Sequence, residues 1–139
     1  MLHDAVVVFE PIAATAGEVY DFARRMENLP RWASGLSSGI IRRDRHWVAQ
    51  SPMGEVEVVM APSNPFGVLD HDVRLSDGTV VHNAFRVSPS GTGCIVTFVV
   101  LRMPGTAQDA FDADVAHVRK DLKALRRLLE SEPQSRGGV

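Results

Sequence analysis

The sequence predicts an α+β domain in which a curved antiparallel sheet of about seven strands wraps around one long C-terminal helix. Three observations predict this fold. Residues 107–130 carry a long amphipathic stripe, residues 40–102 alternate apolar and polar side chains between turns, and a strand with two short helices precedes both. A sheet with one apolar face must bury that face, and the C-terminal helix is the predicted element long enough to cover it.

The N-terminal segment combines one strand with a pair of short helices. Residues 5–9 (AVVVF) are mostly β-branched, which favours a strand. Thr15 precedes Glu18 by three residues, the spacing of a capping box, so a first helix is expected over residues 16–26. Pro30 is favourable in the first turn of a second short helix, because its missing N–H needs no partner there.

The middle of the chain predicts a meander of about six short strands separated by turn residues. The clearest pattern is residues 55–60 (EVEVVM), whose two glutamates share one face while Val56, Val58 and Met60 share the other. Asp77-Gly78 is a strong hairpin signal. The expected strands span residues 40–43, 46–50, 55–60, 69–75, 79–87 and 94–102.

The C-terminal helix is predicted from apolar side chains spaced by three or four residues, which stay on one helix face. They are Phe111, Val115, Val118, Leu122, Leu125 and Leu129. The whole order is therefore strand, two helices, about six strands and a long helix. Residues 1–131 are expected to form one domain, and the polar residues 132–139 a flexible tail.

Composition excludes several classes of function. The chain has 139 residues, with 15 Lys and Arg against 17 Asp and Glu, so it lacks the basic character of a nucleic-acid-binding domain. It contains no apolar run of the roughly 20 residues that span a bilayer, and no secretory signal, so we expect a cytoplasmic protein without a membrane span. The single Cys94 forms no internal disulfide. Motifs for zinc, phosphate-binding loops and nucleophilic serines are missing, so no metal or cofactor is expected.

Several segments together resemble a known superfamily. They are residues 16–22 (AGEVYDF), 28–32 (NLPRW), 54–58 (GEVEV), 67–72 (GVLDHD) and the apolar stripe of the last helix. In this order they resemble the SRPBCC superfamily, whose helix-grip fold is shared by START lipid-transfer domains, birch-pollen allergens, and polyketide cyclases and dehydrases. The polyketide-cyclase-like branch is the most similar. The resemblance implies a cavity between sheet and helix, but it does not specify a reaction.

Two polar residues are expected on the inner face of the sheet. His71 lies between Leu69 and Val73 in the alternation, and Asn83 shares a face with Phe85. Counting back from the Asp-Gly hairpin places His71 and Asn83 near each other across the ladder. Such a pair could orient a ligand, with His71 as a general acid or base. It could equally be a structural hydrogen bond in the core, because buried polar groups are generally paired.

The remaining candidate ligand-binding residues are apolar side chains expected on inner faces, together with one threonine of the last strand. They are Trp32, Trp47, Val58, Met60, Leu69, Phe85, Thr97, Phe111 and Val115. Core packing is an open alternative for each of them. Asp114 and His117 flank the stripe of the last helix, where Asp114 could face the mouth of a cavity or form a surface pair.

Three functions remain open on these observations. The first is binding of a small, mostly hydrophobic molecule in a cavity between the sheet and the last helix. The second is a cyclase, dehydratase or hydrolase of the kind that the resemblance implies, with His71 as acid or base and Asn83 as the orienting group. The third is an interaction protein, for example a homodimer formed through the outer sheet face or its edge strands.

Overall fold

The computed structural model describes residues 2–36 and 38–131; the predicted tail at residues 132–139 lies outside the described residues. Within these residues, twelve elements follow one another. They are β1 (Ala5–Ile12), α1 (Ala16–Ala23), a 3₁₀ turn (Met26–Asn28), α2 (Leu29–Trp32), a second 3₁₀ turn (Ser34–Leu36), β2 (Ile40–Arg43), β3 (His46–Ser51), β4 (Gly54–Met60), β5 (His71–Leu75), β6 (Val80–Ser90), β7 (Gly93–Leu101) and α3 (Gln108–Ser131).

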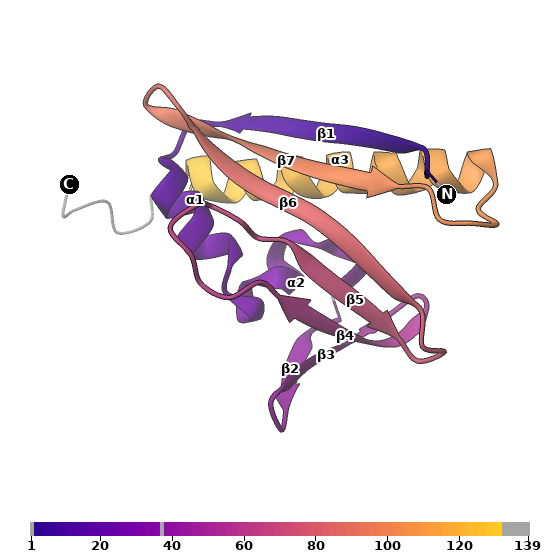
Figure 1. Cartoon of the computed structure of the whole chain (residues 1–139). Helices are drawn as coiled ribbons and strands as arrows, with labels where there is room; N and C mark the ends of the chain where they lie inside the picture. The colour runs from indigo at the N-terminus through magenta and orange to yellow at the C-terminus, as the bar shows by residue number, and fades with distance from the viewer. Residues whose placement is uncertain (1, 37, 132–139) are drawn as a thin grey trace.

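The strands form one seven-stranded sheet in the order β1-β7-β6-β5-β4-β3-β2, and every neighbouring pair is antiparallel. Figure 1 shows the sheet curving so that β1 and β7 run along α3 while β3, β4 and β5 turn away from that helix. The short helices α1 and α2 lie on the same side of the sheet as α3. The predicted fold class and element order are confirmed.

The first helix begins as predicted but ends earlier. Thr15 caps it: the Thr15 hydroxyl oxygen accepts from the Glu18 backbone N–H at 3.2 Å and donates to the Glu18 carboxylate at 3.0 Å. The helix ends at Ala23 rather than at residue 26. The Asn28 side-chain amide donates to the Phe22 carbonyl at 3.0 Å, which satisfies one of the carbonyl groups left open at the helix end.

The core forms where α3 packs against the inner faces of β1 and β7. The apolar stripe of α3 supplies the fully buried Leu122, Leu125 and Leu129. They join a cluster to which β1 and β7 contribute Val8 and Val96, among others. An amphipathic helix of this length is stabilised mainly by such packing, because helix propensity alone is a weak contribution.

The expectation that Thr97 lies on the inner face of the last strand is wrong. Val96 and Phe98 are buried in β7, so Thr97 lies on the outer face, opposite Phe9 of β1 and Arg86 of β6. The physical reason is that residues 95–101 are apolar on both sides of the strand except for Thr97 itself, and one threonine does not identify the solvent face. Thr97 therefore cannot contact a ligand that lies between the sheet and α3.

The segment between β4 and β5 is held against β6 and places the start of β5. The Val87 N–H donates to the Gly67 carbonyl at 2.9 Å, and the Leu69 N–H donates to the Phe85 carbonyl at 2.8 Å. Gly67 has a φ of +72°, and a Cβ atom there would lie 2.3 Å from the Val87 carbonyl oxygen. Glycine is therefore required twice, by backbone conformation and by the close approach of β6.

We predict that Gly67→Ala destabilises the protein by roughly 3 kcal/mol, because it adds a backbone clash to the strain of a positive φ. Gly78→Ala is the matched control: its φ is +93°, but a Cβ there meets nothing within 4 Å. It should cost only about 1 kcal/mol. Urea unfolding measures both free energies, and equal losses for the two variants would contradict the close approach at Gly67.

Candidate functional site

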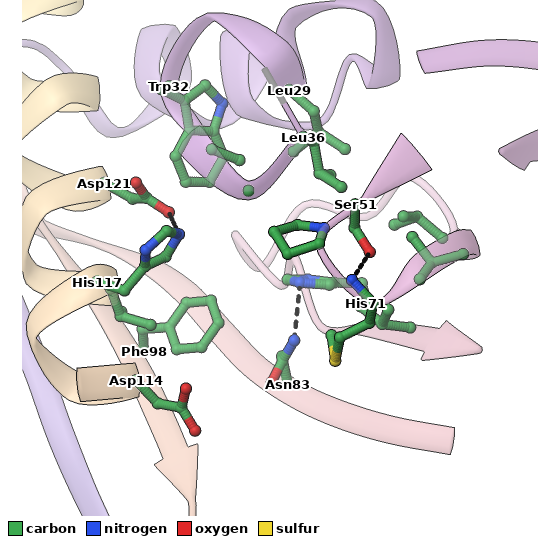
Figure 2. A pocket seen from close by; sticks show the side chains of 18 of the residues that line it. Leu29, Trp32, Leu36, Ser51, His71, Asn83, Phe98, Asp114, His117 and Asp121 are labelled. Atoms are coloured by element: carbon green, nitrogen blue, oxygen red, sulfur yellow. Dashed lines mark hydrogen bonds and ion pairs between the residues drawn. The ribbon is translucent and has the colours of Figure 1, made fainter. Parts of the chain in front are cut away.

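A cavity of about 480 Å³ lies between the sheet and the helices. Its walls come from α2 and the turn after it, the β3–β4 turn, strands β4 to β7, and the middle of α3. Most of the lining is apolar, with Leu29, Trp32, Leu36, Val58 and Val73 among the side chains. Figure 2 shows the polar lining residues in two groups, one on the sheet and one on α3. They are Ser51, His71, Asn83, Asp114, His117 and Asp121.

Within the polar group on the sheet, His71 and Asn83 form a pair. They face each other across β5 and β6, as the hairpin register predicts, and the Asn83 Nδ2 lies 3.3 Å from the His71 Nε2. The other ring nitrogen, Nδ1, lies 3.0 Å from the Leu69 carbonyl oxygen. A carbonyl oxygen can only accept, so Nδ1 carries the proton. In the neutral ring Nε2 then accepts from the Asn83 amide, which fixes the orientation of that amide.

Burial keeps the His71 ring neutral. Its desolvation lowers the pKa of His71, and the hydrogen bond to Leu69 opposes that effect without cancelling it. Phe85 and Phe98 pack edge-on to the imidazole, with ring centroids 6.4 Å and 5.9 Å away. The nearby Asp70 carboxylate is bonded to Arg86 at 2.9 Å. His71 therefore provides a neutral hydrogen-bonding group at the cavity wall.

The second polar group joins α3 to the turn that follows α2. The Ser34 hydroxyl donates to the Asp121 carboxylate at 2.7 Å and lies 3.0 Å from the His117 Nε2. The Ser34 N–H also donates to Asp121, at 3.2 Å. A serine, a histidine and an aspartate thus meet, but the serine proton points to the carboxylate rather than to the imidazole. The cluster therefore lacks the relay of a nucleophilic triad. Its hydrogen bonds connect the turn after α2 to α3.

The structure brings together four of the predicted site residues: Trp32, Val58, His71 and Asn83 all line the cavity. Asp114 and His117 line it as well, on α3. The other apolar candidates are absent from the lining and pack in or against the core instead. They are Trp47, Met60, Leu69, Phe85, Phe111 and Val115. Thr97 lies on the opposite face of the sheet.

Sequence patterns gave no indication of two features of the site. Ser51, Pro52 and Met53 of the β3–β4 turn reach the cavity, although turn residues carry no periodic signal. Ser34 lies 87 positions before its partner Asp121. One signal was present for the helix side: His117 and Asp121 are four residues apart, so they share a helix face beside the apolar stripe.

Three properties of the described residues limit the chemistry of the site. No cluster of three or more His, Cys, Asp or Glu side chains within residues 2–36 and 38–131 could hold a metal ion. Among the helices that the structure describes, none is long and apolar enough to cross a bilayer. Cys94 is buried, which raises the pKa of its thiol to about 11, so it is a poor nucleophile at neutral pH.

We predict that His71 stays neutral, with its proton on Nδ1, at pH values where an ordinary histidine with a pKa near 6.5 is already charged. Long-range ¹H–¹⁵N spectra report both the tautomer and the titration of each ring. The His71→Gln variant assigns the His71 signals by their loss. A ring that titrates at or above pH 6.5, or that carries its proton on Nε2, would contradict the geometry.

No protein-family model and no curated protein matches the chain. Solved structures do match it over nearly its whole length, at identities that establish the fold alone. DynU16 from the dynemicin biosynthetic locus is 16% identical with a TM-score of 0.69, over 92% of this chain and 48% of DynU16. CalU16 from Micromonospora echinospora is 13% identical with a TM-score of 0.67, over 96% and 78% of the two chains. Ara h 8.0201 is 12% identical with a TM-score of 0.68, over 94% and 100%. The chain therefore has the helix-grip fold.

Proposed function

We propose that this protein binds a small, mostly apolar organic molecule in the cavity between the sheet and α3, with Asn83 as the polar contact and His71 as the residue that orients it. The observation that carries the proposal is the cavity itself. Its volume of about 480 Å³ falls in the range of small-molecule sites, and its lining is apolar with a few placed polar groups.

The apolar walls supply the binding energy. Transfer of one methylene group from water to an apolar site contributes about 0.8 kcal/mol, so a chain or ring system of about ten carbons contributes roughly 8 kcal/mol before the costs of association. Val58 and Val73 from the sheet and Leu29 and Leu36 from the helical side form the surfaces for this contact. Such a surface favours apolar molecules of suitable size without identifying one.

Asn83 would orient the ligand through hydrogen bonds from its side-chain amide. Its amide uses one N–H toward His71, and no other partner of its side chain occurs among the described residues. The second N–H and the carbonyl oxygen are then available to a hydroxyl or carbonyl group of a ligand. Because the neutral His71 ring is itself held by the Leu69 carbonyl, the amide is presented in one orientation. His71 therefore acts through Asn83.

Part of the lining reaches the protein surface, which gives a ligand a route inward. Met53 of the β3–β4 turn lines the cavity and is 62% exposed. Asp114 and His117 of α3 also line the cavity and are exposed.

We predict that Val73→Phe weakens binding of the neutral fluorescent probe N-phenyl-1-naphthylamine about tenfold, because the added ring occupies the cavity. Val73 lines the cavity, whereas Val7 lies on the outer face of β1 and is 57% exposed. Val7→Phe is therefore the matched control and should bind the probe like the wild type. Native mass spectrometry of the freshly purified proteins should show a retained small molecule in the wild type and the control only.

The two Val→Phe variants also define the result that would contradict ligand binding in this cavity. Circular dichroism and thermal unfolding establish that each variant is folded. If folded Val73→Phe binds the probe and retains the molecule as the wild type does, ligands do not occupy this cavity. Absence of both probe binding and a retained molecule in the wild type would remove the proposal altogether.

One observation favours an enzyme as the second candidate function. The neutral His71 ring has an unprotonated Nε2 at the cavity wall, which is the state that a general base requires. Asn83 already donates to that lone pair, so a substrate hydroxyl would have to displace the amide before His71 could take its proton. This requirement makes binding the better supported function.

The enzyme candidate predicts that wild type and His71→Gln retain different molecules on purification, the wild type a product and the variant its precursor. For a dehydratase the two masses would differ by one water. Mass spectrometry of the molecules released by organic extraction measures this, and Asn83→Asp, which keeps the size of the side chain, serves as the second variant. Identical molecules in all three proteins would argue for binding without turnover.

A further inference from the structure

The ionisable side chains among the described residues that line the cavity include two acids and no lysine or arginine. Four titratable side chains are present in the lining: His71 on β5, and Asp114, His117 and Asp121 on α3. Among the described lining residues there is no lysine or arginine. A site for a carboxylate or phosphate normally supplies such a cation, often as a bidentate arginine.

The net charge of this set is negative whatever state His117 adopts. His71 is neutral, because burial opposes its protonation, and the two aspartates each contribute one negative charge. The sum is therefore −2 with neutral His117 and −1 with protonated His117. No protonation state of the lining produces a positive site at neutral pH.

The two aspartates differ in their surroundings. Asp121 is held by Ser34 and lies 3.5 Å from the His117 Nε2, and its side chain is only 13% exposed. Asp114 is exposed, and it has no hydrogen-bond or ion-pair partner within residues 2–36 and 38–131. Figure 2 shows both on α3, across the cavity from Asn83 and His71. A ligand that reaches from the sheet wall toward α3 thus brings its far end near an uncompensated carboxylate.

We propose that the cavity selects apolar molecules that carry an amine at the end facing α3 and discriminates against those that carry a carboxylate there. This inference rests on the proposed function, since it concerns the ligand class of the same site. A carboxylate would enter a site whose described lining residues carry a net charge of −2 or −1 and include no lysine or arginine, so Coulomb repulsion opposes its binding. A protonated amine would gain the interaction that the carboxylate loses.

The test compares three probes of equal chain length: dodecylamine, dodecanol and dodecanoate. Each compound is titrated, below its own critical micelle concentration, into the wild-type protein loaded with N-phenyl-1-naphthylamine at neutral pH and low salt, and displacement of the probe is measured. We expect the amine to bind most tightly, the alcohol next, and dodecanoate about tenfold more weakly than the amine. The ratio between amine and carboxylate should shrink at high salt, because added ions screen the exposed Asp114.

The Asp114→Asn variant tests whether the preference for the amine comes from the Asp114 carboxylate. It should reduce the amine-to-carboxylate ratio about threefold or more by removing the uncompensated charge. Asp112→Asn is the matched control, because it changes the net charge of the same helix equally, and Asp112 is exposed and absent from the cavity lining. This control should leave the ratio unchanged, and dodecanol affinity should be the same in both variants.

Each outcome bears on one proposal. If dodecanol displaces the probe but dodecanoate binds as tightly as the amine, the selectivity is overturned while the binding function stands. If Asp112→Asn changes the ratio as much as Asp114→Asn, the selectivity reflects the net charge of the protein and the assignment to this lining is overturned. If none of the three compounds displaces the probe, the proposed function fails, and the selectivity with it.

Discussion

The fold depends on the packing of one amphipathic helix against a sheet that is wider than the helix can cover. The helix α3 packs mainly against β1, with further contacts to α2 and β7, whereas β3 to β5 curve away from it (Figure 1). The same twist that closes the sheet around the helix therefore separates the two layers at the far strands. The cavity is a consequence of this geometry, and α2 and the turn after it close one side.

Two sets of hydrogen bonds keep the walls of this cavity in place. On the sheet, His71 is held by the Leu69 carbonyl and in turn orients Asn83. On the helical side, Ser34 and Asp121 connect the turn after α2 to α3. Each set links backbone to side chain across separate elements, so the polar atoms have defined positions although most of their neighbours are apolar. A cavity with such fixed polar atoms can distinguish ligands of similar size.

Local patterns predicted those features that depend on neighbours in sequence. The Asp77-Gly78 turn sets the register of β5 and β6, and this register pairs His71 with Asn83. The pattern could not assign Thr97 to a face, because its strand is apolar on both sides. It also could not separate Val58, which lines the cavity, from Phe85, which is completely buried behind it. Both point inward, and only the spacing of the layers decides which one a ligand can reach.

The division between apolar walls and a few polar atoms also explains why the fold alone says little about the ligand. Structures with 12–16% identity reproduce the sheet and the helix, since many apolar residues can fill the same positions. Binding energy from such walls is nearly indifferent to ligand identity. Under the proposed function, the choice among ligands of similar size comes from single polar groups, the open amide of Asn83 and the uncompensated carboxylate of Asp114. Two chains with one fold can therefore share a cavity of the same shape and still bind different chemical classes.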